Sequence, residues 1–322
     1  MSGPELAPAT EPTLYFIGVT TGKSSILQVF PRWSEALDLG ARIVGIDLPL
    51  HAPAEDYRRV VAFIKDDPLS RGALVTTHKI DCYRAARDLF DEVEPLAELM
   101  GELSCIAKRD GRLVASAKDP LTSGLAIAAI MPAGHFARTG AEALVLGAGG
   151  ASIAITWNLM QAARGADRPS RIVVSDIDQG RLDEMRHVHG RFGSDVPVTY
   201  ALSRRRNDND GLVAGLAPGS LVVNATGLGK DGPGSPLTHA VTFPEDGFVW
   251  ELNYRGDLVF LRQAANQAAA RRLAVADGWI YFLHGWTRVI ADVFDVEIPT
   301  EGTGFERLSE LAGGRPTPTA AP

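Results

Sequence analysis

The chain has 322 residues, of which 45% are hydrophobic and 22% are charged. Such a chain can bury a substantial core, and its length suits two domains of ordinary size. The formal net charge is -7 and no basic stripe runs along the sequence, which argues against a nucleic-acid partner.

The two cysteines, Cys82 and Cys105, are too few for a disulfide framework, and neither lies in a metal-spaced pair. We therefore expect reduced thiols, no metal site and a cytoplasmic protein. Residues 1–12 lack the basic start and apolar stretch of a secretory signal, so a loose tail is expected there. No apolar run approaches the roughly 20 residues that span a bilayer, so no membrane partner is expected.

From Leu14 onward, short apolar runs alternate with longer segments of helical period, which is typical of a parallel sheet covered by helices on both faces. The predicted strands of the first part are Leu14–Val19, Ala41–Leu48, Ala73–Thr76, Leu103–Lys108 and Arg112–Ala115. The predicted helices between them are Ser25–Leu39, Ala54–Lys65 and Cys82–Leu89. This pattern predicts an α/β fold.

After Pro132 a second block begins with an apolar strand at Ala143–Leu146, a glycine turn and a helix. The further predicted strands are Arg171–Ser175, Pro197–Ala201, Leu221–Ala225 and Phe248–Leu252. The run from Trp279 onward returns to helical period. The block predicts a compact doubly wound unit, and the histidines His135, His187, His189 and His239 are expected at its surface.

The glycine turn carries the signal of a dinucleotide-binding loop. Gly147 and Gly149 occupy the first two places of G-x-G-x-x-G, and Gly150 and Ala151 follow. Glycine is needed there because only a residue without a side chain lets the backbone approach a pyrophosphate, whose charge then lies at the helix N-terminus. The strand before the loop and the helix after it strengthen the signal.

The next predicted strand ends at Asp176, where a carboxylate can accept hydrogen bonds from the adenosine ribose. A carboxylate would repel a 2′-phosphate, so Asp176 favours NAD over NADP. The alternative is that Asp176, or Asp178 two residues later, only begins a turn. Asn224, Ala225 and Thr226 end another strand and are expected on the nicotinamide side, although a tight turn explains them as well.

Lys79 and Asp119 each follow a predicted strand and each stand next to an expected helix start. An amine beside a carboxylate can move a proton on and off an alcohol during hydride transfer. Spacing alone does not establish Lys79 and Asp119 as a catalytic pair, because lysines and aspartates in loops are more often solvated surface residues. Lys118 is a second candidate for the role of the lysine.

The sequence resembles the shikimate and quinate dehydrogenase family in order from about Leu14 to Pro299. Stretches similar to those of the family are Val75–Lys79, Ala117–Pro120, Gly147–Ala151, Asn224–Thr226 and Glu251–Gly256. Val75–Lys79 is one residue shorter than the family's stretch and lacks its proline. Ala117–Pro120 keeps only the aspartate, Asp119.

The resemblance implies a substrate-binding and catalytic domain at residues 13–130 and a Rossmann NAD(P)-binding domain with a doubly wound parallel sheet at 131–278. A C-terminal helix within 279–312 would fold back onto the first domain, and 1–12 and 313–322 would be flexible tails. It also implies a catalytic dyad of Lys79 and Asp119. The positions that it implies for substrate binding are Ser24, Ser25, Thr76, Ser104, Tyr254 and His284. Gly278, just before the last helical run, joins the candidate cofactor-binding residues.

The sequence departs from the family pattern mainly at the positions that contact the ring hydroxyls of the substrate. The family's two asparagines are Leu74 and Ser104 here, and its closing glutamine falls at Gly285, next to His284. A site that loses polar partners leaves buried ligand hydroxyls unpaired. His78 and His284 then suggest a pocket reshaped for another ring, with Trp279 and Trp286 either joining it or serving as helix core.

We therefore expect an NAD-dependent alcohol oxidoreductase, with NADP as the less favoured cofactor, acting on a cyclic hydroxy acid related to shikimate or quinate. It would act as a monomer or homodimer, in or near aromatic amino acid biosynthesis. One alternative is a ligand or NAD sensor that kept the fold and lost turnover. Another is the same chemistry on an aminated or aromatic-pathway relative of the substrate.

Overall fold

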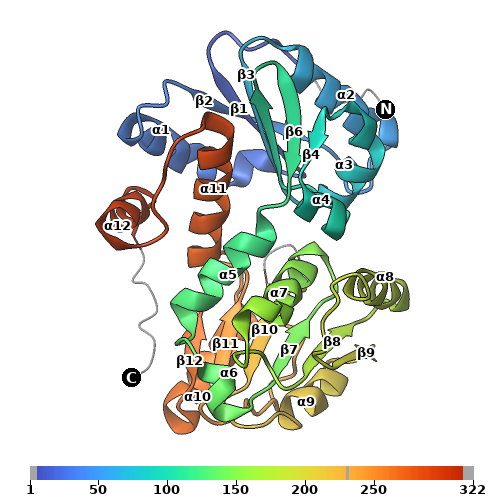
Figure 1. Cartoon of the computed structure of the whole chain (residues 1–322). Helices are drawn as coiled ribbons and strands as arrows, with labels where there is room; N and C mark the ends of the chain where they lie inside the picture. Colours follow the sequence, from blue (N-terminus) through green and yellow to red (C-terminus); the bar gives the residue numbers. More distant parts are fainter. Residues whose placement is uncertain (1–5, 230–231, 315–322) are drawn as a thin grey trace. The chain divides into compact units, whose positions relative to one another are not determined.

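The structure is a computed structural model that describes residues 6–229 and 232–314 (Figure 1). The described chain divides into two compact units. Unit 1 comprises the residues up to Lys118 and those from Leu283 onward, and unit 2 comprises Asp119–Phe282. The expected domain boundaries lay at 130/131 and 278/279, and the assignment of substrate and nucleotide to separate domains stays a prediction.

Unit 1 contains a six-stranded sheet in the order β2-β1-β3-β5-β6-β4. Its strands are β1 (Thr13–Gly18), β2 (Arg42–Asp47), β3 (Ser70–Val75), β4 (Glu92–Val93), β5 (Cys105–Arg109) and β6 (Arg112–Ser116). The expected parallel sheet is found only in part here: the pairs β1–β2, β1–β3 and β4–β6 are parallel, whereas β5 pairs antiparallel with both β3 and β6. The reason is the turn Asp110-Gly111, whose two positive φ angles of 50° and 76° join β5 and β6 as a tight hairpin.

Helices cover both faces of this sheet (Figure 1). They are α1 (Ile26–Ala36), α2 (Ala54–Asp66), α3 (Lys79–Ala86), α4 (Pro95–Met100), the later part of α11 (Trp279–Phe294) and α12 (Gly302–Leu311), with 3-10 turns η1 (Thr21–Lys23) and η2 (Arg87–Leu89). Side chains alternate along β1, so Tyr15 and Ile17 join a core with α2 and α3, whereas Phe16 packs edge-on against Trp286 of α11 at 5.0 Å. Trp286 therefore belongs to the core.

The C-terminal segment is held to the first helix of unit 1. The indole N–H of Trp33 donates to the carbonyl of Leu308 at 2.8 Å, and the rings of Phe30 and Phe294 lie 6.4 Å apart. At the other end of the chain, residues 6–12 are not a loose tail, because the Ala9 N–H donates to Asp67 at 2.8 Å. Residues 1–5 and 315–322 of the expected tails lie outside the described residues.

Unit 2 contains a six-stranded sheet in the order β12-β11-β10-β7-β8-β9, and all its pairings are parallel. The strands are β7 (Ala143–Leu146), β8 (Ile172–Asp176), β9 (Val198–Leu202), β10 (Leu221–Asn224), β11 (Phe248–Glu251) and β12 (Ala274–Ala276). The strand order reverses between β7 and β10, and such a switch point opens a ligand crevice at the carboxyl ends of the strands. The predicted doubly wound unit is confirmed.

The helices of unit 2 are α5 (Asp119–Ile130), α6 (His135–Thr139), α7 (Gly150–Met160), α8 (Gln179–His189), α9 (Arg206–Ala214) and α10 (Val259–Arg271), with a 3-10 turn η3 (Ala162–Arg164). Helices α5 and α7 pack closely, since a side chain at Gly124 would meet Asn158 at 2.2 Å. Residues of α9 and α10, including Val213 and Phe260, form a core with the central strands.

Two histidines expected at the surface of unit 2 are buried instead. The ring of His135 bonds to the carbonyl of Gly219 at 2.7 Å, and the ring of His189 lies between the hydroxyls of Thr156 and Tyr200 at 2.8 and 2.7 Å. Both rings make hydrogen bonds inside the unit, which the sequence spacing did not reveal.

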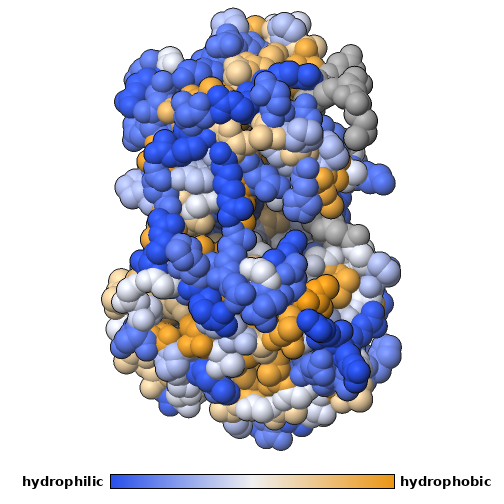
Figure 2. All heavy atoms as spheres, turned by 90° about the vertical axis from the view of Figure 1, so that its right-hand side faces the viewer, coloured by the Kyte–Doolittle hydropathy of each residue, from blue (hydrophilic) through white to orange (hydrophobic). Residues whose placement is uncertain are grey.

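Exposed apolar side chains are scattered over the molecule. Figure 2 shows one face, where hydrophilic residues predominate and hydrophobic ones form separate smaller areas. The large hydrophobic side chains with high exposure are Leu50, Leu121, Ile177 and Leu202. Within residues 6–229 and 232–314, no helix has both the length and the apolar character needed to cross a membrane.

Candidate active site

Several of the predicted substrate and catalytic residues of unit 1 meet at one edge of its sheet. Strands β1, β3 and β6 run in the same direction, so their carboxyl ends share an edge with the start of β5. Ser24 and Ser25 follow β1, Thr76 and Lys79 follow β3, and Ser104 immediately precedes β5. Because parallel strand ends deliver their loops to one side, the fold brings these five residues to the same edge.

The loop that delivers Lys79 is short and tightly bonded. The N–H of Thr76 donates to the carbonyl of Ile17 at 3.0 Å, so the chain is still paired with β1 when β3 has ended. Thr77 then adopts a left-handed conformation with φ of 62°, which costs a β-branched residue roughly 1–2 kcal/mol. Lys79 begins α3, and its carbonyl accepts a hydrogen bond from the N–H of Leu103 at 3.3 Å.

The competing lysine, Lys118, is committed to ion pairs. Its amine lies 3.0 Å from a carboxylate oxygen of Asp292 on α11 and 3.4 Å from one of Glu94. Burial opposes its charged form, but Cys105, Asp292 and Glu94 together outweigh burial, so the pKa of Lys118 is raised. Lys118 is thus engaged by carboxylates within unit 1, and the choice of Lys79 for proton transfer stays a prediction.

Asp119 follows Lys118 directly along the chain and is the first residue of α5. Its side chain is buried, and the N–H of Lys118 just before it donates to the hydroxyl of Ser104 at 2.8 Å. Ser104 therefore fixes the backbone that leads into Asp119. The pairing of Lys79 with Asp119 stays a prediction.

The other expected substrate residues have clear local surroundings. Ser24 and Ser25 are half-buried in the turn that begins α1. Tyr254 lies in unit 2, with its ring 5.5 Å from Trp279 and 4.7 Å from Phe282. The two partners stack at 5.1 Å, so Trp279 is part of an aromatic cluster. The roles of these three candidates in binding a substrate stay predictions.

His284 faces helix α12. Its ring stacks on Phe305 at 4.6 Å with an interplanar angle of 10°, and the side chain is buried. Burial, with a smaller effect of Arg288, lowers the pKa of His284 to about 4. Nδ1 of His284 is buried and makes no hydrogen bond to any described residue, so a polar atom is available there.

The glycine loop of unit 2 has the geometry of a phosphate cradle. Gly147 has φ of 100°, and a side chain there would meet the carbonyl oxygen of Ala225 at 2.8 Å. The loop after β7 therefore touches the loop after β10, which is the switch point of the sheet. A side chain at Gly149 would meet nothing within 4 Å, and Gly150 and Ala151 begin α7. Free space beside a helix N-terminus suits a dinucleotide pyrophosphate.

Asn224 is the centre of a buried network that the sequence did not indicate. Its amide N–H donates to the carboxylate of Glu251 at 2.7 Å, and its carbonyl oxygen accepts from the hydroxyl of Thr226 at 2.7 Å. Glu251 also accepts bonds from the backbone and side chain of Asn253 at 2.9 and 2.7 Å. Burial raises the pKa of Glu251 to about 7, although these hydrogen bonds favour the ionised form. The one feature of the sequence that could have indicated this network is the charged Glu251 inside the apolar run Phe248–Leu252.

Gly278 closes the same end of unit 2. Its N–H donates to the carbonyl of Asn253 at 3.1 Å, and a side chain there would meet the carbonyl oxygen of Leu252 at 1.9 Å. Glycine is therefore required by the close approach to the loop after β11. Direct binding of a cofactor by Gly278 stays a prediction.

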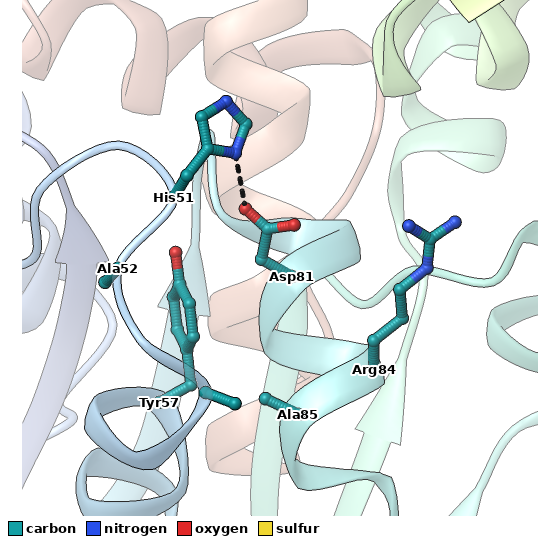
Figure 3. A pocket seen from close by; sticks show the side chains of 7 residues that line it. His51, Ala52, Tyr57, Asp81, Arg84 and Ala85 are labelled. Carbon is teal, nitrogen blue, oxygen red and sulfur yellow. Dashed lines mark hydrogen bonds and ion pairs between the residues drawn. The ribbon is translucent and has the colours of Figure 1, made fainter. Parts of the chain in front are cut away.

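A cavity of about 290 Å³ lies in unit 1 between the start of α2 and helix α3 (Figure 3). It is lined by His51, Ala52, Ala54, Tyr57, Asp81, Arg84 and Ala85. At its rim the ring of His51 lies 3.2 Å from the carboxylate of Asp81. Within the described parts of the chain, no three His, Cys, Asp or Glu residues are grouped so that they could hold a metal ion.

The fold defines a class: an α/β protein of two units, the second of which has a Rossmann-type doubly wound parallel sheet. No protein-family model matches the chain. It is 28% identical over 310 residues to a protein named shikimate dehydrogenase (NADP(+)) from Sphingopyxis alaskensis, covering 95% of this chain and 97% of the relative. It is also 28% identical over 180 residues to the protein of that name from Lactococcus lactis subsp. cremoris, where the match spans 59% of the relative.

Solved structures share the whole fold. A shikimate dehydrogenase in complex with NADP+ matches 96% of this chain with a TM-score of 0.70 and 18% identity. Quinate dehydrogenase from Corynebacterium glutamicum in complex with NAD matches 94% of it with a TM-score of 0.71 and 18% identity. The predicted resemblance is confirmed: the chain is similar in sequence to proteins named shikimate dehydrogenase and similar in fold to shikimate and quinate dehydrogenases.

Proposed function

We propose that the protein is an oxidoreductase of the shikimate and quinate dehydrogenase type, which interconverts a secondary alcohol and a ketone on a cyclic hydroxy acid with a nicotinamide dinucleotide. The names of its relatives support this activity. The observation that carries it is the delivery of Lys79 to the edge of the unit 1 sheet that also holds Thr76 and Ser104. An amine at such an edge can exchange a proton with a bound hydroxyl.

In the oxidative direction, Lys79 takes the hydroxyl proton of the substrate, and in the reductive direction it returns the proton. Asp119 would orient the Lys79 amine toward that hydroxyl. A bound nicotinamide dinucleotide would supply the hydride acceptor or donor. Ser24, Ser25 and Tyr254 would hold the substrate carboxylate, and Thr76 would contact a ring hydroxyl, as the family resemblance implies.

The substrate ring is proposed to carry fewer or differently placed hydroxyls than shikimate. Leu74 is buried in β3 where the family has an asparagine, and it offers no hydrogen bond. Ser104 replaces a second asparagine, and its hydroxyl oxygen already accepts the N–H of Lys118 at 2.8 Å. Each ring hydroxyl left unpaired in a buried site would cost roughly 1–3 kcal/mol.

NAD is proposed as the preferred cofactor. The Asp176 carboxylate stands at the end of β8 beside the glycine loop, where it would repel a 2′-phosphate. The comparisons support a nicotinamide dinucleotide and favour NADP over NAD, since the curated relatives are named for NADP(+), whereas the solved structures hold either NADP or NAD.

A cofactor-reduction assay with a panel of cyclic hydroxy acids, including shikimate and quinate, tests the proposal. Wild-type protein is expected to form NADH with at least one acid. The Lys79→Ala variant should turn it over about 10²–10⁴-fold more slowly while binding NAD as wild type does. Unchanged turnover in that variant would remove Lys79 from the mechanism. Binding of an acid without reduction of the cofactor would instead favour a sensor.

A further inference from the structure

His78 immediately precedes Lys79 and is one of the most buried polar residues of unit 1, with 1% of its surface exposed. Its ring lies between two other elements. Nδ1 is 3.0 Å from the hydroxyl of Tyr57 on α2, and Nε2 is 3.1 Å from the carbonyl oxygen of Leu48, which follows β2. The residue before Lys79 is therefore fixed from two sides.

The partners of the ring determine its hydrogen-bonding state. A carbonyl oxygen can only accept, so Nε2 of His78 carries the proton and donates it to Leu48. Nδ1 is then free of a proton and accepts the O–H of Tyr57. Burial lowers the pKa of His78, which keeps this neutral ring in place at neutral pH. Both ring nitrogens are satisfied, and such a buried, fully paired group is held rigidly.

The backbone around His78 is constrained as well. Thr77 has the left-handed φ of 62°, a conformation that a β-branched residue adopts at a cost and that the surrounding structure must maintain. The N–H of His78 donates to the carbonyl of Thr76 at 2.6 Å, and its own carbonyl accepts the N–H of Cys82 at 2.8 Å. The strained turn and the first turn of α3 thus meet at His78, one residue before the amine.

We propose that Tyr57 and His78 are positioning residues, which hold the start of α3 so that the Lys79 amine points to the reacting hydroxyl. This inference rests on the proposed function of Lys79. Figure 3 shows the Tyr57 side chain rising from α2 beside the end of α3 that carries Asp81. In this chain the buried Tyr57–His78 hydrogen bond would fix the turn before Lys79, where the family pattern has a proline. Neither residue exchanges a proton with the substrate.

The test compares Tyr57→Phe, His78→Ala and His78→Gln with wild type, using the panel acid that is turned over fastest. Tyr57→Phe keeps the ring packing and removes the hydroxyl that donates a hydrogen bond to Nδ1 of His78. His78→Gln keeps a donor for the Leu48 carbonyl. Tyr200→Phe is the matched control, because it removes a hydroxyl 2.7 Å from the buried ring of His189, in unit 2 rather than unit 1. The measured quantities are kcat, KM for the acid and for NAD, and the melting temperature.

A displaced catalytic amine lowers kcat with little change in binding. We expect kcat to fall about tenfold in Tyr57→Phe and about 10²-fold in His78→Ala, with partial recovery in His78→Gln and KM for NAD unchanged. Tyr200→Phe should keep kcat within about twofold of wild type. Because Tyr57→Phe retains the packing, it keeps the test decisive if His78→Ala fails to fold.

Two outcomes separate this inference from the proposed function. If Lys79→Ala loses turnover but Tyr57→Phe keeps wild-type kcat, the positioning role is wrong and the proposed function stands. If Lys79→Ala keeps full turnover, or if no acid is turned over by wild type, the proposed function fails and the inference falls with it. A fall of kcat in Tyr200→Phe equal to that in Tyr57→Phe would show a general structural effect and would also overturn the positioning role.

Discussion

The carboxylate of Asp176 accepts a hydrogen bond from the backbone N–H of Ala148 at 2.7 Å. Ala148 lies inside the glycine loop, between Gly147 and Gly149, so the acidic residue at the end of β8 is tied directly to the proposed phosphate cradle. The other carboxylate oxygen accepts the N–H of Asp178 at 2.9 Å. The same side chain thus begins a turn and places a carboxylate beside the loop, and its role toward the adenosine ribose stays a prediction.

Replacing Asp176 by Ser should change cofactor preference. Removal of the negative charge is expected to raise KM for NAD about tenfold and to improve kcat/KM for NADP, so that the ratio of the two efficiencies shifts by about 10². Initial rates with each cofactor measure the ratio. Asp178→Ser is the control, because Asp178 caps α8 by accepting the N–H of Gly180 at 2.7 Å. Equal efficiency with both cofactors in wild type would contradict the proposed role of Asp176.

Two glycines of the loop should fail in different ways when replaced by alanine. Gly147→Ala places a methyl group 2.8 Å from the Ala225 oxygen and at φ of 100°, so the free energy of unfolding should fall by roughly 1–2 kcal/mol or more. Gly149→Ala meets no atom within 4 Å, so stability should stay near wild type. Its methyl group should nevertheless weaken NAD binding by obstructing the pyrophosphate.

Urea unfolding and fluorescence titration with NAD measure these two effects. Loss of stability in Gly149→Ala, or wild-type NAD affinity in it, would show that the space beside Gly149 is not a cofactor site.

Glu251 should make the stability of the protein depend on pH in the acidic range. Its pKa is about 7 in the folded protein against an ordinary value of 4.5, so the unfolded state releases its proton first as pH rises. The contribution of Glu251 to the free energy of unfolding should be most favourable below pH 4.5. It should fall by up to about 3 kcal/mol between pH 4.5 and 7. Above pH 7 the contribution is constant.

Glu251→Gln removes that titration, so the difference in unfolding free energy between wild type and variant should vary with pH across this window. Denaturant unfolding at several pH values gives the two curves, and Glu245→Gln, at an exposed carboxylate, is the control. Parallel curves for wild type and Glu251→Gln would show that the buried carboxyl keeps its ordinary pKa.

Asp292 should be a major determinant of the stability of unit 1. Its carboxylate pairs with Lys118 at 3.0 Å and with Arg109, and accepts the hydroxyl of Ser116 at 3.1 Å. Asp292→Ala leaves Lys118 buried without its nearest partner, so the free energy of unfolding should fall by about 3 kcal/mol.

The loss should be visible as a lower urea midpoint. Asp183→Ala, which removes an exposed carboxylate paired with Arg186, should leave the midpoint almost unchanged. A similar small effect in both variants would show that the Asp292 cluster does not hold α11 to the sheet.

The sequence predicted the strands of both units well where apolar runs end in small or polar residues. Val75 and Leu146 end such runs because side chains inside a sheet covered on both faces must be apolar, whereas the loops beyond it need not be. The sheet order of unit 1 was not predictable in this way. The apolar runs of β5 and β6 look alike in either direction, and only the turn at Asp110-Gly111 makes the hairpin antiparallel.

By itself, the sequence determined the glycine loop, the acidic end of β8 and the position of Lys79 after a strand, because each depends on residue type at a local spacing. Only the tertiary structure decided what the polar residues between these positions do. His78 is anchored by Tyr57, which is 21 residues away, and Lys118 is held by Asp292, which is 174 residues away (292 - 118 = 174). Such partners are chosen by packing between elements, and residue type along the chain does not encode which buried groups will meet.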